Sequence, residues 1–307
     1  STLDRSSAAS DVYKRQMQVR SHLRPFIRTP RLAGLAAAAL LAAALAGCAS
    51  SSAPARDWTQ QLQRWSDAPI VLLGEQHDAV AHQAWQQATV EQLAKQERLA
   101  ALVIEMAPRT GSTASLARDA SEDAVQQALQ WQDAAWPWPR YRGVVMAAVR
   151  AGVPVLGGNL PRADMKQAMR NENLDTHLPP EGWQRQLDAI REGHCGLLPD
   201  TQLAPMARIQ LARDASMAEV ARAAVKPGKT VLLVAGRGHV LRGVGIPTWL
   251  PEAAGAKVAV AQAGETSVAQ ASDVDWLQKT DALPAKDHCA ELREKFRNPP
   301  APRADAG

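Results

Sequence analysis

The chain has 307 residues, with 35 Lys and Arg against 31 Asp and Glu, which gives a formal net charge of +4. The first 47 residues hold seven of the basic residues and two of the acidic ones, so the remainder has 28 basic against 29 acidic residues. That remainder has a net charge of −1 and no basic stripe of the kind that binds nucleic acid. Charge and its distribution therefore exclude a nucleic-acid-binding protein.

Two segments without a fold of their own begin the chain. Residues 1–16 have no apolar period and precede Met17, and they are typical of an expression or sequencing scar. From Met17, a basic stretch leads into the apolar run "LAGLAAAALLAAALA" at 32–46. As a helix, this run would rise about 22 Å, against roughly 30 Å of hydrocarbon in a bilayer. Residues 17–47 are therefore predicted to be a secretory signal peptide.

The leader ends in "LAGC" at residues 45–48, which looks like a bacterial lipobox. Its small residues would admit the signal peptidase, and the thiol of Cys48 would take the lipid. The alternative is an ordinary buried cysteine after an Ala-rich core helix. We expect a mature lipoprotein that begins at Cys48, with residues 48–57 as a short flexible tether between the membrane and the domain.

Cys195 and Cys289 are the cysteines that remain, and each follows a histidine. A metal site made of Cys and His is one interpretation. A disulfide is favoured, because adjacent His and Cys side chains diverge and because a secreted protein folds in an oxidising compartment. Such a bridge would hold the C-terminal segment against the core.

Five apolar runs of strand length recur between residues 69 and 262. They are continuous rather than alternating, which is typical of strands buried on both faces. Helical patterns separate them, so we predict a single α/β domain over 58–297, with a mainly parallel sheet and helices on both faces, and a disordered tail over 298–307. The predicted strands are 69–74, 100–106, 153–159, 230–236 and 257–262, and the predicted helices are 79–96, 121–131, 139–150 and 181–224, the last broken around "HCGLLPD".

Polar side chains follow four of these strands. In parallel sheets, binding sites gather at the carboxyl ends of the strands. Each residue also has a plainer explanation: a glycine permits a tight turn, a glutamate caps a helix, and a histidine makes hydrogen bonds at the rim. The pattern Gly-x-x-His nevertheless occurs twice, at 74–77 and 236–239, and this repetition predicts a functional site. Its members are Glu75, His77, Glu105, Asn159 and His239.

The segments "VLLGEQHD", "VIEM", "WPWPRYRGVVMAAVRAGVPVLGGNLPR", "QLARDASMA" and "LLVAGRGHVLRGVGIPTWL" follow one another between residues 68 and 250. In this order they resemble the ChaN family of haem-binding, iron-regulated lipoproteins, of a superfamily shared with Tiki proteases, TraB and erythromycin esterases. The resemblance implies haem binding in iron uptake at the bacterial outer membrane, facing the periplasm. It also implies an outer-membrane haem receptor as partner, and a homodimer. Ala49 after the lipidated cysteine, in place of Asp, favours outer-membrane delivery.

The same resemblance offers a second function. It places the superfamily's paired Gly-x-x-His motifs and acidic residues on Glu75, His77, Glu105 and His239, which in the protease branch belong to a metal-dependent hydrolytic centre. Imidazole and carboxylate groups can bind manganese, zinc or cobalt and leave a position open for water. Spacing does not decide which group ligates and which acts as a base. A metal-dependent peptidase or esterase is therefore the alternative.

One helical stripe and one further arginine fit either function. Residues 210, 213, 214 and 217 lie on one helix face. In one interpretation this face is exposed to solvent and includes a single methionine. In the other, Gln210, Arg213 and Asp214 orient the strand-end groups, and Met217 contacts the cofactor. Arg162, beside Asn159, can pair with a carboxylate such as a haem propionate.

Aromatic residues suggest where a porphyrin could lie. The chain has nine Trp against two Phe and two Tyr, and "WQDAAWPWPRY" gathers Trp131, Trp136, Trp138 and Tyr141. These rings either receive a porphyrin or pack in the core. Tyr ligates iron in some haem proteins, so Tyr141 is the candidate axial ligand, with His82 and His177 as further candidates.

Overall fold

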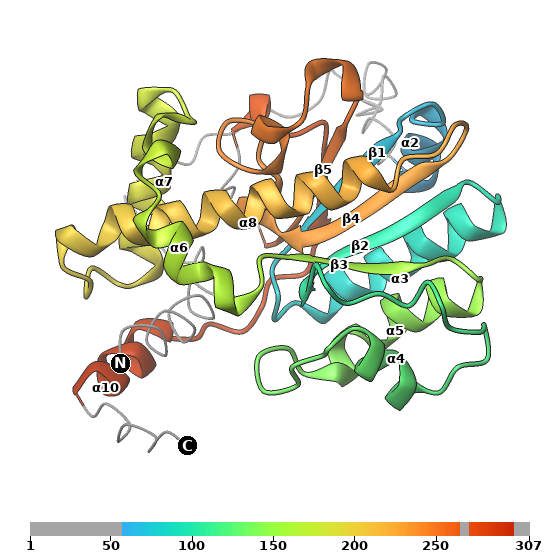
Figure 1. The fold of residues 1–307 in the computed structure, drawn as a ribbon, viewed down its shortest axis with the longest axis horizontal. Helices are drawn as coiled ribbons and strands as arrows, with labels where there is room; N and C mark the ends of the chain where they lie inside the picture. The colour runs from blue at the N-terminus through green and yellow to red at the C-terminus, as the bar shows by residue number, and fades with distance from the viewer. Residues whose placement is uncertain (1–56, 265–269, 298–307) are drawn as a thin grey trace, which may run out of the picture.

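The structure is a computed structural model that describes residues 57–264 and 270–297 (Figure 1). The predicted scar, signal peptide, lipidated Cys48 and C-terminal tail lie outside these residues, as does almost all of the tether. Of the helices within them, none is long and apolar enough to cross a membrane.

A single parallel sheet of six strands organises the described chain, in the order β3-β2-β4-β1-β5-β6. The α/β fold with a parallel sheet is therefore confirmed. Five strands match the predicted runs. The sixth, β6, was not predicted because it lies at the edge of the sheet and its last three residues are polar, which leaves no continuous apolar run. The strands are β1 (Ile70–Glu75), β2 (Leu99–Pro108), β3 (Val155–Asn159), β4 (Thr230–Gly236), β5 (Lys257–Ala263) and β6 (Trp276–Thr280).

Helices cover both faces of this sheet. The broken helical stretch over 181–224 is two helices, α7 and α8, separated by a loop and a short 3-10 helix. The α-helices are α2 (Trp58–Arg64), α3 (Val80–Lys95), α4 (Glu122–Ala128), α5 (Trp138–Arg150), α6 (Met165–Arg170), α7 (Pro180–Gly193), α8 (Leu203–Ala223), α9 (Arg237–Val240) and α10 (His288–Arg297). The 3-10 helices are η1 (Arg162–Asp164), η2 (Glu172–Thr176), η3 (Asp200–Gln202), η4 (Ile246–Trp249), η5 (Glu252–Ala254) and η6 (Ala271–Asp273).

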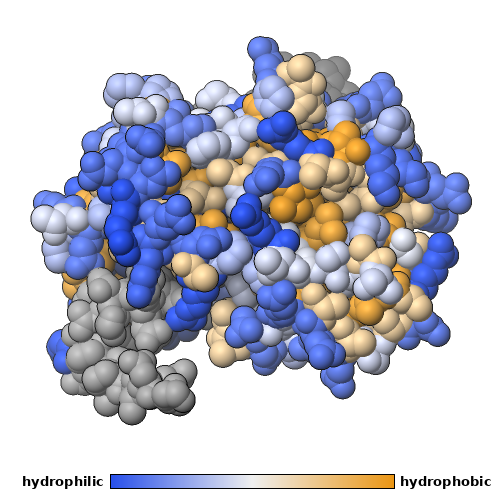
Figure 2. Space-filling view, in the orientation of Figure 1, coloured by the Kyte–Doolittle hydropathy of each residue, from blue (hydrophilic) through white to orange (hydrophobic). Residues whose placement is uncertain are grey.

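Alternate residues of the strands point to two separate cores. Leu73, Leu102 and Val234 pack toward α3 and α5, whereas Leu72 and Leu233 pack toward α8, which crosses the near face in Figure 1. Figure 2 shows that hydrophilic residues dominate the part of this face that α7 occupies, while hydrophobic residues are interspersed over the opposite half. Burial on both faces explains why the strands are continuously apolar.

A disulfide joins Cys195, in the turn after α7, to Cys289 in α10, with 5.7 Å between the Cα atoms. The bridge spans 94 residues of sequence. It attaches the C-terminal helix to the part of the molecule formed by α7 and α8, and it engages both thiols that the Cys/His metal-site interpretation required.

Candidate functional site

The strand-end residues of the two Gly-x-x-His motifs form one buried cluster. His77 Nδ1 lies 2.7 Å from Glu75 Oε1, and His239 Nδ1 lies 2.6 Å from Asp214 Oδ1. The Nε2 atoms of both histidines face Glu105, at 3.8 Å for His77 and 3.6 Å for His239. All five residues are at most 5% exposed. Two carboxylate–imidazole pairs therefore flank one central carboxylate.

Strand register brings these residues together. β1 and β4 are parallel neighbours in which Glu75 pairs with Gly236, so His77 and His239 leave the sheet side by side. β2 lies on the other side of β4 and delivers Glu105, whose Oε2 accepts a hydrogen bond of 2.8 Å from the Gly236 N–H. The convergence expected from the sequence thus follows from a parallel sheet.

Glu75 is held as a carboxylate by its neighbours. Its Oε2 accepts from the side-chain amides of Gln83 at 2.6 Å and Gln86 at 2.8 Å, and its Oε1 accepts from the Tyr141 hydroxyl at 2.8 Å. Burial alone would raise the pKa of Glu75, but the hydrogen bond and charge of His77, with the bonds from Tyr141 and Gln83, lower it below its ordinary value. The His77 N–H must therefore be the donor in that pair.

The second carboxylate–imidazole pair is made by Asp214 and His239. Burial raises the pKa of Asp214 to about 6 against the opposing effect of His239. Burial would lower the pKa of His239, but the negative charges of Asp214 and Glu105 raise it above its ordinary value. The two neighbouring carboxyl groups therefore favour the charged form of the His239 ring, which burial alone would disfavour.

This arrangement has the donor types of a metal site. Carboxylates commonly hold metal-ligating histidines by one ring nitrogen and leave the other for the ion. Ligands of a tetrahedral ion lie about 3.4 Å apart, close to the two Nε2–carboxylate distances. However, among the described residues no group of three or more His, Cys, Asp or Glu side chains has the geometry of a metal centre. The donor set suits a divalent ion, while its present arrangement is that of a hydrogen-bonded cluster.

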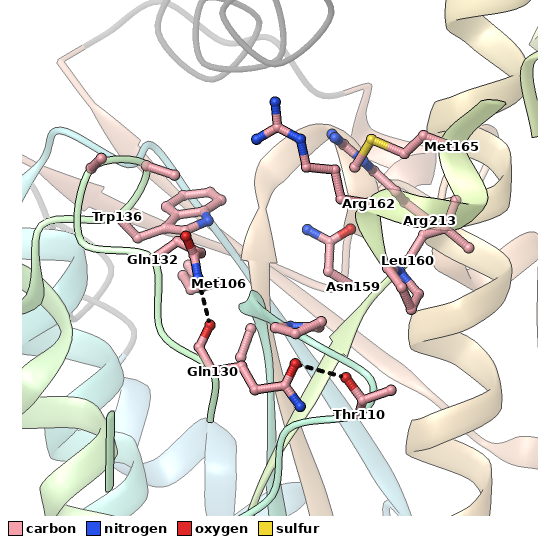
Figure 3. Close-up of a pocket in the computed structure, with 15 residues that line it drawn as sticks. Met106, Thr110, Gln130, Gln132, Trp136, Asn159, Leu160, Arg162, Met165 and Arg213 are labelled. Atoms are coloured by element: carbon pink, nitrogen blue, oxygen red, sulfur yellow. Dashed lines mark hydrogen bonds between the residues drawn. The ribbon is translucent and has the colours of Figure 1, made fainter. Parts of the chain in front are cut away.

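A cavity of about 530 Å³ lies beside the cluster, at the carboxyl ends of β2 and β3 (Figure 3). Two contacts connect it to the cluster: the Asn159 side-chain amide donates to the backbone oxygen of Glu105 at 2.9 Å, and Trp136 contacts the His77 ring with centroids 4.9 Å apart. The apolar lining is Met106, Ala107, Pro108, Ala134, Ala135, Trp136, Leu160, Pro161 and Met165, and the polar lining is Thr110, Gln130, Gln132, Asn159, Arg162 and Arg213.

Some residues predicted for a cofactor line this cavity and others do not. Asn159 and Arg162 line it, together with Arg213, which was predicted only to orient the strand-end groups. Tyr141 is absent from the lining, because its hydroxyl donates to Glu75 instead. Burial raises the pKa of Tyr141 well above its ordinary value, and the charge of Glu75 adds to this, so the phenol is neutral.

The other predicted ligands also lie away from the cavity. Met217 is fully buried in the core between the sheet and α8. His82 uses both ring nitrogens, one toward the Gln76 N–H and one toward the Thr280 hydroxyl. His177 stacks on Trp249 with ring centroids 3.5 Å apart. The structure does not bring any of these three side chains to the cavity.

Two further predicted groups are the polar residues of α8 and the aromatic residues between 131 and 141. Asp214 holds His239, as an orienting residue would, whereas the side chain of Gln210 is buried with no hydrogen-bond partner for its Oε1 atom among the described residues. The four aromatic rings between 131 and 141 contact one another in the core, and of these only Trp136 lines the cavity. The aromatic stretch is thus mainly core.

Met106 and Met165 were missed by the sequence analysis, although both line the cavity. A signal was present for each. Met106 directly follows Glu105 at the end of a predicted strand, and Met165 lies three residues after Arg162, a spacing that places two side chains on the same side of a helical turn.

Comparison with known proteins decides the family. The family described as "Haem-binding uptake, Tiki superfamily, ChaN" matches residues 61–250, more than half of the chain. The chain belongs to this family. No curated protein matches the chain significantly.

Two solved structures resemble this member of the ChaN family. A structure of cofacial haem binding to ChaN of Campylobacter jejuni is 23% identical, with a TM-score of 0.60, and the match covers 72% of this chain and 91% of that one. The type III effector HopBA1 is 14% identical, with a TM-score of 0.39 and coverage of 73% and 92%. The similarity to the Campylobacter structure shows that the two proteins share a fold.

Proposed function

We propose that this ChaN-family protein binds haem in the cavity beside the strand-end cluster. The observation that carries the proposal is the charge of the cavity wall. Two arginines, Arg162 and Arg213, line it, and none of the described residues that line it is Asp or Glu. Haem is a flat apolar ring with two propionates, so its charge and shape complement a wall of this composition.

The volume and the polarity of the cavity agree with haem as its ligand. A volume of about 530 Å³ lies within the range of small-molecule sites, roughly 300 to 1,000 Å³. Trp136 and Leu160 give the wall flat and apolar surface, and the amides of Asn159, Gln130 and Gln132 supply orienting hydrogen bonds. The haem binding of the Campylobacter ChaN protein adds support from a relative that shares the fold.

The cellular setting is part of the same proposal. The lipobox at 45–48 supports a lipoprotein held at the outer membrane and facing the periplasm, where it would receive haem from an outer-membrane receptor. A homodimer is part of the same proposal.

A metal-dependent hydrolase is the second candidate. The observation that favours it is the symmetrical arrangement of His77 and His239 about Glu105, with each imidazole held by another carboxylate. Those groups would hold a manganese, zinc or cobalt ion, and a water activated on it would attack a peptide or ester.

Titration of the purified protein with haemin, followed at the Soret band, tests the first proposal against the second. We expect saturable binding that weakens by about tenfold in Arg162→Gln and in Arg213→Gln, because each loses a charge-assisted hydrogen bond to a propionate. Arg150→Gln, at the exposed end of α5, is the matched control and should bind as the wild type does.

Parallel titrations with manganese and zinc complete the experiment. Weak, unsaturable haemin binding would contradict the haem proposal. Tight metal binding that both His77→Ala and His239→Ala abolish, together with peptidase or esterase turnover dependent on that metal, would establish the hydrolase in its place.

A further inference from the structure

We propose that the surface at the amino ends of the strands docks on a membrane that carries acidic phospholipids. This surface lies at the opposite end of the sheet from the cavity, and its cellular setting rests on the lipid anchor of the proposed function. Five segments lead into the amino ends of β1, β2, β3, β4 and β5 and are together called the basic rim. They are residues 64–69, 95–98, 150–154, 222–229 and 251–257.

Positive charge is concentrated in the basic rim. Its segments contain eight Lys and Arg side chains against three carboxylates, a net charge of +5. The chain after residue 47 has a net charge of −1, so the rest of that chain sums to −6. The cations are far apart in the sequence, and the parallel sheet brings them to one end of the molecule. They are Arg64, Lys95, Arg98, Arg150, Arg222, Lys226, Lys229 and Lys257, and the carboxylates are Asp67, Glu97 and Glu252.

Contacts of Arg98 show that three of these segments meet. Its guanidinium donates to the backbone oxygen of Ser66 at 2.7 Å and lies 3.5 Å from the Thr230 hydroxyl. The Thr230 hydroxyl in turn donates to the backbone oxygen of Ala68 at 2.9 Å. Figure 1 shows α2 and the turn between α8 and β4 at the same end of the sheet, away from α6. The basic rim is therefore one continuous surface.

Its cations are not neutralised within the protein. None of the eight forms an ion pair with a carboxylate among the described residues. Six of them are exposed, and Arg98 and Lys257 are half-buried. Basic residues in the last turn of α2, α3, α5 and α8 complement the partial negative charge of a helix end. The other four cations lie outside the helices, and that role does not account for them.

An exposed apolar side chain lies among these cations. Val225 is 40% exposed, and it is one of two large hydrophobic residues that are exposed in the described chain. It directly precedes Lys226, in the same turn as Lys229. Surfaces that combine basic and apolar side chains suit the lipid interface, because the cations approach the phosphates and the apolar group enters the headgroup region.

The predicted anchor would hold the basic rim close to the membrane. Nine residues separate Cys48 from Trp58, a stretch that spans about 35 Å at most. Helix α2 begins at Trp58, is about 10 Å long and ends in the basic rim at Arg64. The cluster and the cavity lie at the carboxyl ends of the strands, so docking through the basic rim turns the cavity away from the lipid and toward the periplasm.

Co-sedimentation with vesicles tests this surface without the anchor. Every described element begins after residue 57, so a chain of residues 48–307 with Cys48→Ser retains the fold and carries no acyl chain. At about 0.05 M salt it should bind vesicles of equal parts phosphatidylcholine and phosphatidylglycerol at least about tenfold more tightly than vesicles of phosphatidylcholine alone. Salt at about 0.5 M should remove most of the difference, because the Debye length then falls to about 4 Å.

Two double variants of that chain locate the binding surface. Lys226→Gln with Lys229→Gln should weaken binding to the acidic vesicles about tenfold. Lys166→Gln with Lys279→Gln is the matched control, because both lysines are exposed outside the basic rim and the change in net charge is the same. This control should bind nearly as the parent does.

Equal binding to both kinds of vesicle, or an equal loss in the two double variants, would overturn the inference and leave the anchor and haem proposals standing. Failure of the anchor would appear separately, in the processing of the full-length chain with Cys48→Ser, and failure of haem binding would appear in the haemin titration.

Discussion

At the scale of single residues, His82 shows how a buried histidine can be fixed in its neutral form. The Gln76 N–H donates to Nδ1 at 3.0 Å, so Nε2 must carry the proton, and it donates to the Thr280 hydroxyl at 3.0 Å. The ring is 0% exposed, and burial lowers its pKa to about 4, against the charge of Glu75, which raises it. This histidine therefore ties α3 to the edge strand β6 as a neutral group.

The lowered pKa of His82 predicts acid-sensitive stability. In the unfolded chain His82 titrates near its ordinary value of 6.5, so between pH 6.5 and about 4 the unfolded state binds more protons than the folded state. The free energy of unfolding should fall as the pH falls through this window, by about 3 kcal/mol in total, and should show no further His82 contribution below it.

Denaturant unfolding as a function of pH measures this effect. His82→Gln should lose about 1 to 3 kcal/mol at pH 7, since one or both hydrogen bonds are broken, and its stability should then depend less on pH between 6.5 and 4. His177→Gln is the comparison, because that half-buried ring has a pKa lowered by burial alone. Equal slopes for wild type and His82→Gln would refute the assignment.

The sequence predicted the position of a side chain correctly where the course of the backbone alone determines that position. Glu75, His77, Glu105 and His239 meet because parallel strands end at one edge of the sheet, and a parallel sheet could be predicted from strands that alternate with helices along the chain. Tyr141 and His82 lie on helices, where the direction of a side chain depends on how the helix packs. Their contacts with Glu75 and Thr280 required the tertiary structure.

At the scale of elements, the glycines of the two Gly-x-x-His motifs provide space rather than tight turns. Neither Gly74 nor Gly236 is among the described residues with positive φ. A Cβ on Gly74 would lie 2.5 Å from Val240 Cγ2, and a Cβ on Gly236 would lie 2.7 Å from His77 Nε2. The motif therefore allows α9 and the histidines to pack directly on the strand ends.

Gly74→Ala should consequently destabilise the protein by about 1 to 3 kcal/mol, the usual cost of overpacking a core. Thermal or denaturant unfolding measures this loss. Val240→Ala removes the atom nearest to the new methyl group, so the double variant should be more stable than the sum of the two single losses predicts. Additive losses would show that the clash with the Val240 side chain is not the cause.

Helix α8 illustrates how an element can be predicted while its contacts are not. The stripe at 210, 213, 214 and 217 exists, and its plain interpretation as an exposed face is wrong because all four residues are buried. Asp214 reaches His239, Arg213 reaches the cavity, and Met217 packs on the sheet. One helix face meets three different environments, because the sheet, the cavity and α9 all adjoin it. No periodicity in the sequence encodes that division.

At the scale of the whole molecule, the cluster and the cavity are adjacent but distinct. The cluster is buried and held by carboxylates and amides, whereas the cavity is lined by two arginines and apolar groups. Trp136 and Asn159 contact the cluster and line the cavity at the same time. Haem bound in the cavity would therefore lie against two residues that contact His77 and Glu105 of the cluster.

The predicted anchor concerns the chain as a whole, since it determines where the haem site operates. If "LAGC" at 45–48 is a lipobox, Cys48→Ser should leave a full-length precursor that is neither lipidated nor trimmed, because a hydroxyl does not replace the thiolate as lipid acceptor. Membrane fractionation and intact-mass measurement of the expressed protein check this expectation.

Cys289→Ser provides the matched cysteine control. It removes the bridge to Cys195 and releases α10 from the turn after α7, which should lower stability by about 2 to 5 kcal/mol without any effect on processing at Cys48. That variant should still be trimmed, lipidated and recovered with membranes. Because each substitution replaces one cysteine by serine, a difference between the two variants in membrane recovery depends on which cysteine was replaced. Normal trimming and membrane recovery of Cys48→Ser would refute the anchor, and with it the proposal that this domain holds haem at the outer membrane.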